Sequence, residues 1–216
     1  QLFEDLVGKG LGQQFRLGDL SRGVELSVQQ GPQDPQGVVC LPGDDQGGSS
    51  LPHGFWIQHI NLDKIAENAR VMKNLTEKHH IEITGVTKVF GGEERIAQTL
   101  VNQGIKRLGD SRIENIRNYE NLPCEKWLIR MPSISEAREV VQFCDVSVNS
   151  ELETLKALNQ QAIQLKKKHK VILMVDLGDL REGYFKEEHL AEAINYAKQA
   201  KGLDLYGLGT NLTCFS

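Results

Sequence analysis

The sequence predicts an α/β protein with a parallel sheet, and among parallel folds it favours a (β/α)8 barrel of the TIM type. From Trp56 onward, short apolar runs alternate with helical patterns at a spacing of roughly 20–35 residues. Each apolar run also ends in a polar or charged residue. Such endings are expected in a barrel, because the loops at the carboxyl ends of its strands build the active site.

The first elements after the start of this pattern are a strand and a helix. Residues 56–60 alternate like a short strand, and Asn61 is a suitable N-cap for the helix that follows. The apolar positions of that helix recur at helical spacing: Ile65, Ala69, Met72 and Leu75. Six further apolar runs are predicted as strands, at residues 81–88, 107–111, 127–131, 146–150, 171–178 and 203–211.

Helices are predicted between these strands. They are expected to begin near Glu93, Arg112, Ser135, Glu151 and Glu187. Ser133 can cap the third of them, and Gly104 and Gly202 stand where helix C-caps are expected. Strands that alternate with helices in this way predict parallel pairing with right-handed crossovers.

The competing parallel fold is the doubly wound sheet. A dinucleotide-binding sheet requires G-x-G-x-x-G after its first strand, but the sequence there reads "KVFGGEER". "GDSR" matches the expected end of the next strand only in part, and the P-loop pattern is absent. The barrel is therefore preferred, although a closed barrel needs eight strands. We expect the sequence to hold about six of them, and we expect this chain alone to be inactive.

The composition limits the functional classes. The chain has 216 residues, of which 39% are hydrophobic and 25% charged, as in globular proteins. It contains no apolar run long enough to span a membrane and no secretory pattern at its start. The four cysteines lack the spacing of a metal site or a disulfide framework, which predicts reduced thiols in a cytoplasmic protein.

Residues 1–55 differ from the rest of the chain. They hold eleven of the 21 glycines, four of the six prolines and eight glutamines, and no helical or strand period persists there. We expect a disordered or extraneous leader, followed by the partial barrel at residues 56–216. The leader has three Lys or Arg against seven Asp or Glu, whereas the remainder has 22 of each sign. A balanced domain without a basic stripe gives no reason to expect nucleic acid as a partner.

The candidate site consists of the polar residues that end the predicted strands. Lys88 has the most distinctive chemistry, because an uncharged lysine amine can attack a carbonyl group. The equal alternative is that this lysine forms an ion pair with Asp110 or Asp176. Such an ion pair would stabilise the mouth of the barrel, which is the opening where the carboxyl ends of the strands meet. The candidate residues are Lys88, Asp110, Arg130, Asn149, Arg181 and Asn211.

Five segments together resemble the N-terminal barrel domain of the alanine racemase family, in its ornithine racemase-like branch. They are "INLDKIAENARV", "GVTKV", "GIKRLGDSRIENI", "VILMVDLGDLREG" and "GLGTNL", and their order and spacing cover about residues 56–216. The resemblance implies a homodimeric, pyridoxal 5'-phosphate-dependent enzyme that interconverts amino-acid enantiomers. It also implies a β-rich C-terminal domain, which supplies a tyrosine across the dimer as the second catalytic base. No residue of this chain can take that role.

The resemblance also implies roles for individual residues. Lys88 falls on the lysine that holds the cofactor as an internal aldimine, and Arg181 matches the arginine near the cofactor's phenolic oxygen. Asn211 stands where alanine racemases carry a histidine, which implies a different contact with the pyridine ring. The tyrosine that follows the cofactor lysine in alanine racemases is missing from "KVFGG". Alanine is therefore not the expected substrate.

Two other functions compete with the racemase. One is a non-enzymatic barrel like the pyridoxal-phosphate homeostasis proteins, which carry "G-E-N-x-x-Q" where this chain has "GDSRIEN". The other is a truncated chain that binds nothing.

Overall fold

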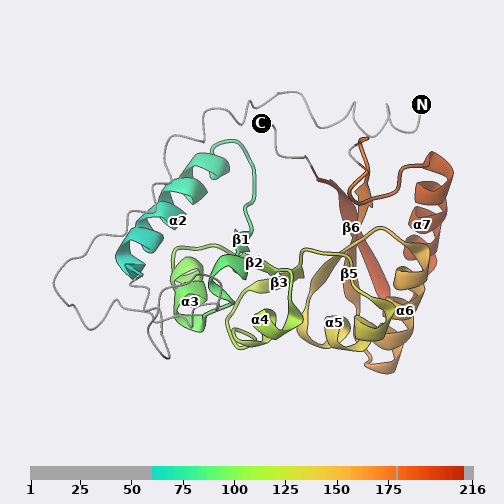
Figure 1. The fold of residues 1–216 in the computed structure, drawn as a ribbon, viewed down its shortest axis with the longest axis horizontal. Helices are drawn as coiled ribbons and strands as arrows, with labels where there is room; N and C mark the ends of the chain where they lie inside the picture. The colour runs from blue at the N-terminus through green and yellow to red at the C-terminus, as the bar shows by residue number, and fades with distance from the viewer. Residues whose placement is uncertain (1–59, 179, 212–216) are drawn as a thin grey trace, which may run out of the picture. The chain divides into compact units, whose positions relative to one another are not determined.

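The computed structural model describes residues 60–178 and 180–211, and these contain one six-stranded sheet (Figure 1). All strand pairs are parallel, and the strand order follows the chain from β1 to β6. The strands are β1 (Gly85–Val86), β2 (Arg107–Asp110), β3 (Glu125–Leu128), β4 (Val146–Asn149), β5 (His169–Val175) and β6 (Leu203–Thr210).

Each strand is connected to the next through helical structure. The helices are α2 (Leu62–Glu77), η2 (Lys88–Phe90), α3 (Glu94–Asn102), α4 (Ile113–Arg117), η3 (Ile134–Glu136), α5 (Ala137–Phe143), α6 (Leu152–Gln164) and α7 (Glu187–Gln199). In Figure 1, α3 to α7 follow one side of the row of strands. A doubly wound sheet would reverse its strand order at a switch point, and the described strands have no such reversal. The prediction of a barrel-type α/β fold is confirmed.

The hydrophobic core lies between the strands and these helices. Leu108, Leu128 and Leu173 are completely buried on the helix-facing side of the sheet. They pack in one cluster with helix residues such as Ile116 of α4 and Leu155 of α6. Burial of one such side chain stabilises a fold by roughly 1.5–3 kcal/mol. This core fixes the strands and thereby the positions at which their carboxyl ends meet.

The opposite side of the sheet carries a polar and aromatic cluster. Glu125 accepts hydrogen bonds from Trp127 Nε1 at 2.7 Å and from Lys170 Nζ at 2.6 Å. Arg107 Nη2 donates to the Tyr206 hydroxyl at 3.0 Å, which links β2 to β6. Hydrogen bonds from Lys170 and Trp127 and the charges of Lys170 and Arg107 outweigh burial and lower the pKa of Glu125. This cluster lies toward the amino ends of the strands, away from the candidate site.

Several predicted boundaries are confirmed and others are wrong. Asn61 caps α2 through its side chain, and Ser133 forms a capping box with Glu136 at η3. Gly104 follows α3 with a φ of 84°, as expected for a C-cap glycine. Gly202 is not a C-cap, since α7 ends at Gln199 with an extended cap at Ala200.

The predicted strand at residues 81–88 is also wrong in extent. Regular pairing covers Gly85–Val86, and Lys88 already belongs to η2. The carbonyl of Thr87 accepts from the amides of Phe90 and Gly92, and these bonds turn the chain away from the sheet. The run predicted from Trp127 is shifted as well, because β3 begins at Glu125. The strand predicted at residues 56–60 and the leader lie outside the described residues, except for Ile60, which is in neither a helix nor a strand.

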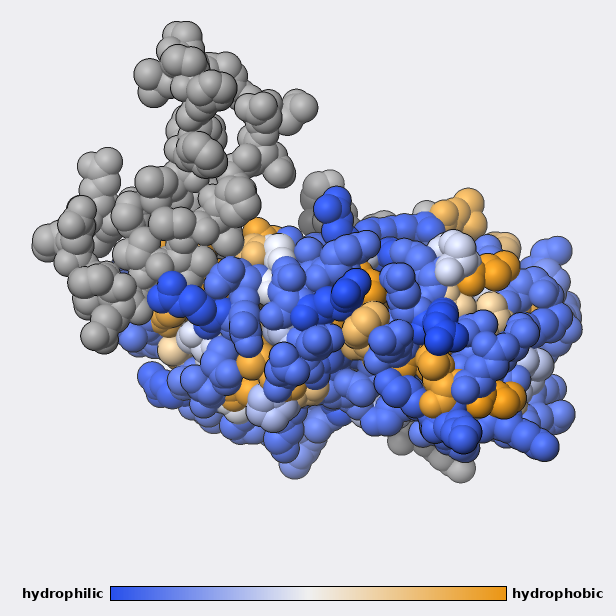
Figure 2. All heavy atoms as spheres, turned by 90° about the horizontal axis from the view of Figure 1, so that it is seen from below, coloured by the Kyte–Doolittle hydropathy of each residue, from blue (hydrophilic) through white to orange (hydrophobic). Residues whose placement is uncertain are grey.

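The face drawn in Figure 2 is mainly hydrophilic, with small groups of hydrophobic residues between charged ones. No helix in the described part of the chain is long and apolar enough to cross a membrane.

Candidate active site

Lys88 lies at the carboxyl end of β1, two residues after the last strand residue, Val86, and it is the first residue of η2. Its side chain is exposed, and its amine makes no hydrogen bond or ion pair with any described residue. It lines a groove of about 890 Å³ together with Gly91, Ser111, Arg112 and Asn115. The alternative of an ion pair with Asp110 or Asp176 is therefore not found in the described part of the chain. The amine is free for chemistry in this groove.

The turn after Lys88 depends on two glycines. Gly91 and Gly92 have φ values of 61° and 70°. Residues other than glycine rarely adopt backbone conformations in this region. A Cβ atom at Gly92 would also collide with the carbonyl oxygen of Asn115. Asn118 Nδ2 donates to the carbonyl of Gly91 at 3.0 Å. The "GG" after the lysine thus allows the turn to lie directly on α4.

Asp110 ends β2 but does not face the groove. It shares the buried side of β2 with Leu108 and is completely buried. Its Oδ2 accepts from Thr87 Oγ1 at 2.6 Å, and its Oδ1 accepts from the Arg112 amide at 3.0 Å and from Asn115 Nδ2 at 3.1 Å. This carboxylate is placed to organise the site and not to contact a ligand in the groove.

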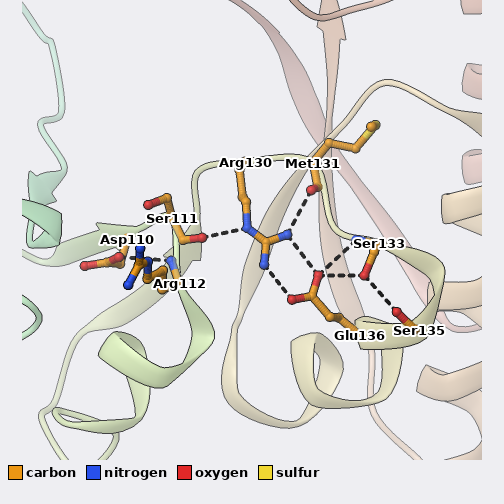
Figure 3. A network of polar contacts seen from close by, with 8 residues as sticks. All are labelled: Asp110, Ser111, Arg112, Arg130, Met131, Ser133, Ser135 and Glu136. Atoms are coloured by element: carbon orange, nitrogen blue, oxygen red, sulfur yellow. Dashed lines mark hydrogen bonds and ion pairs between the residues drawn. The ribbon is translucent and has the colours of Figure 1, made fainter.

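Arg130 is engaged with protein groups (Figure 3). Its Nε donates to the carbonyl of Ser111 at 2.6 Å, and Nη1 and Nη2 donate to the two carboxylate oxygens of Glu136 at 2.9 Å and 2.6 Å. The hydrogen bonds from Arg130 lower the pKa of Glu136 to about 2. The guanidinium thus joins the end of β2 to the last residue of η3.

Asn149 ends β4 and is completely buried on the side where Leu173 of β5 lies. Its Nδ2 donates to the backbone oxygen of Ser147 at 2.9 Å and to Ser147 Oγ at 3.1 Å. Ser147 Oγ lies 2.8 Å from His169 Nε2. Burial lowers the pKa of His169 to about 4, so this imidazole is neutral at pH 7. Asn149 Oδ1 has no hydrogen-bond partner among the described residues.

Arg181 and Asn211 lie at the other end of the row of strands. The loop after β5 is held by Asp176 Oδ1, which accepts from the amides of Gly178 at 2.7 Å and Leu180 at 3.2 Å. Arg181 is exposed in this loop. The next residue, Glu182, accepts from Asn211 Nδ2 through Oε1 at 2.6 Å. The loop after β5 is thus connected to the end of β6.

The predicted residues therefore fall into three groups. Lys88 lines a groove, Arg181 is exposed and Asn211 is held beside Glu182, all at the carboxyl ends of their strands. Asp110 and Asn149 are buried on the helix-facing side, and Arg130 is bound to Glu136. Thr87 is not among the residues that the sequence predicts for the site. Its direction follows from the strand register, because Gly85 pairs with Leu108 and Thr87, two residues later, lies on the same helix-facing side.

Comparisons with known proteins identify the chain's relatives. The family model "Alanine racemase, N-terminal domain" matches residues 60–216. An ornithine racemase from Acetoanaerobium sticklandii is 42% identical over 156 residues, and a lysine racemase from Thermotoga maritima is 38% identical over 158 residues. Each match covers 72% of this chain and 44% of the relative. The chain thus spans less than half the length of these curated relatives.

Solved structures agree on the fold. An alanine racemase from Clostridium difficile 630 superposes with a TM-score of 0.64 at 23% identity, covering 71% of this chain and 41% of that one. The strand order, the match over residues 60–216 and the identity to two racemases agree with one another. The chain belongs to the family of the alanine racemase N-terminal domain.

Proposed function

We propose that the full-length protein is a pyridoxal-phosphate-dependent amino-acid racemase, with Lys88 as the residue that holds the cofactor. The free amine of Lys88 in its groove is the observation that carries this proposal. The proposal is also supported by the family membership and by the resemblance of "GVTKV" to the segment that carries the family's cofactor lysine.

Lys88, Arg181 and Asn211 each offer a group suited to this cofactor, at the carboxyl side of the sheet. Lys88 offers an amine without a competing hydrogen bond, and Arg181 offers an exposed guanidinium in a loop that Asp176 holds. Arg181 would contact the cofactor's phenolic oxygen, since a charge-assisted hydrogen bond favours an anionic acceptor. The amide of Asn211 is oriented by Glu182, so its Oδ1 remains available as an acceptor near the ring.

When bound, pyridoxal phosphate supplies an electron-accepting ring that makes the α-hydrogen of an attached amino acid acidic. Lys88 would then remove or return a proton at the substrate's α-carbon on one face. A second base must serve the opposite face, because inversion requires exchange on both sides. We propose that this base lies outside residues 60–211 and that the protein acts as a homodimer, as in the family. The scattered cysteines support a cytoplasmic location.

A basic amino acid such as ornithine or lysine is the proposed substrate. Support comes from the two relatives at 42% and 38% identity, which are an ornithine racemase and a lysine racemase. The sequence "KVFGG" also lacks the tyrosine that follows the cofactor lysine in alanine racemases. Both observations disfavour alanine.

The full-length protein should be incubated with L-ornithine, L-lysine or L-alanine, and the enantiomers should be separated by chiral chromatography. We expect the D-enantiomer of a basic amino acid to accumulate, and we expect Lys88→Ala to abolish this. Lys198→Ala is the matched control, because Lys198 is an exposed lysine on α7. A protein that binds pyridoxal phosphate without racemising any of the three would instead be a cofactor-binding homeostasis protein.

A further inference from the structure

The chain on both sides of Lys88 is tied to neighbouring elements, whereas Lys88 itself is not. On the amino-terminal side, the Thr87 amide donates to the carbonyl of Gly109 at 2.9 Å. On the carboxyl-terminal side, Asn118 binds the carbonyl of Gly91, and Gly92 packs against the backbone of Asn115. The backbone that carries the reactive amine is thus fixed before and after the lysine.

Thr87 makes the contacts that hold the chain on the amino-terminal side of Lys88; we call these contacts the amino-terminal tie, and the contacts of Gly91 and Gly92 with α4 the carboxyl-terminal tie. It is completely buried, and its hydroxyl donates to Asp110 Oδ2 at 2.6 Å. The Tyr119 hydroxyl lies 3.2 Å from Thr87 Oγ1. Burial raises the pKa of Tyr119, so this phenol keeps its proton and can donate to Thr87. A hydroxyl in this position has both its donor and its acceptor capacity in use.

Asp110 connects the two ties. One of its oxygens receives the Thr87 hydroxyl, and the other receives the amide of Arg112 and the side chain of Asn115. Asn115 and Asn118 belong to α4 and the turn that ends it, and the loop with Gly91 and Gly92 rests on these residues. One buried carboxylate therefore sets the position of β1's end and of the helix that supports the loop after Lys88.

We infer that Thr87 and Asp110 are positioning residues for Lys88, because their hydrogen bond fixes the backbone from which its amine enters the groove. This inference rests on the proposed function, since it requires Lys88 to be the cofactor lysine. A reacting amine must approach its carbonyl in a narrow range of geometry, and displacement by about 1 Å can reduce a rate about 100-fold. Loss of the tie should therefore weaken the covalent attachment of the cofactor.

The test is a titration of the full-length apoprotein with pyridoxal phosphate. The absorbance of the covalent adduct is measured at each concentration of the cofactor. Thr87→Val keeps the size of the side chain and removes the hydroxyl, and we expect it to weaken adduct formation by about tenfold to 100-fold. Thr87→Ser retains the hydroxyl and should restore wild-type binding. Thr154→Val is the matched control, because Thr154 is a buried threonine on α6. It should leave the titration unchanged even if it lowers the melting temperature.

Asp110→Asn is a second variant in case Thr87→Val does not fold. The new amide NH2 group either faces Thr87 Oγ1 as a donor or replaces the oxygen that accepts from the Arg112 amide and Asn115. In both cases hydrogen bonds of Asp110 are lost, so this variant should also weaken adduct formation. If the Thr87→Val and Asp110→Asn proteins gave the same titration curves as the wild type, the positioning role would be contradicted. The proposed function would not be affected by that result. A Thr87→Ser protein as defective as Thr87→Val would also contradict it. If reduction of the wild-type adduct labels a lysine other than Lys88, both the inference and the assignment of Lys88 fail.

Discussion

Arg181 is predicted to act on the cofactor and not on the stability of the fold. It is exposed in the loop after β5, and its guanidinium has no hydrogen-bond partner among the described residues. Arg181→Ala in the full-length protein should therefore leave the melting temperature nearly unchanged. It should shift the pH dependence of the cofactor's absorption, because the contact that we propose between Arg181 and the phenolic oxygen would be lost. Identical pH titrations of variant and wild type would contradict this role.

His169 is predicted to make stability depend on pH. Burial lowers its pKa from 6.5 to about 4 in the folded chain, so the unfolded chain binds a proton more readily. The stabilisation is complete above pH 6.5 and is lost as the pH falls from there toward 4. Between pH 7 and pH 5 the free energy of unfolding should fall by about 2 kcal/mol from this residue.

The variant that tests this is His169→Gln, measured by denaturant unfolding at several pH values. Its free energy of unfolding should depend less on pH between 5 and 7 than that of the wild type. The exposed His189 on α7 is the control, and His189→Gln should keep the wild-type dependence. Equal slopes for His169→Gln and wild type would show that His169 is not a buried neutral residue.

At the scale of elements, the contact between α6 and the start of β6 requires a glycine. The Gly202 amide donates to Asn159 Oδ1 at 2.8 Å, and an added Cβ would lie 2.7 Å from the Asn159 carbonyl oxygen. Gly202→Ala should therefore cost about 1–3 kcal/mol of stability through overpacking. Gly207→Ala, where no described atom lies within 4 Å of an added Cβ, should be much less destabilising. Thermal unfolding of the two variants measures the difference, and equal losses would contradict the packing argument.

Periodicity predicted the elements well, and it predicted the direction of side chains poorly. The helix after Asn61 and the alternation of strands with helices follow from apolar spacing and capping residues. A polar residue at the end of a strand, however, gives the same sequence pattern whether it faces the helices or the mouth. Asp110 and Asn149 face the helices because they share a side with Leu108 and Leu173, and this depends on strand register.

Arg130 illustrates a related limit of sequence reasoning. Its partner Glu136 lies six residues away, across a turn that begins at the capping box of Ser133. The capping box is readable in the sequence as S-x-x-E. Arg130 also donates to the carbonyl of Ser111 after β2, and this is a tertiary contact that no local pattern encodes.

For the whole molecule, the central point is that the carboxyl ends of all six described strands lie on the same side of the sheet. Six parallel strands in chain order bring Lys88, Arg181 and Asn211 to the carboxyl side of the sheet. In β/α barrels this side holds the active site, and it does so because the loops that follow the strands meet there. The 42% identity with an ornithine racemase supports the proposal that racemase chemistry takes place at this side of the sheet.

The most direct test of this account is to find the lysine that carries the cofactor. The full-length protein should be loaded with pyridoxal phosphate, reduced with borohydride, digested and analysed by peptide mass spectrometry. The account predicts one reduced cofactor adduct, on Lys88, and none in a Lys88→Ala protein treated in the same way. An adduct on a different lysine, or equal labelling of many lysines in wild type and variant, would contradict it.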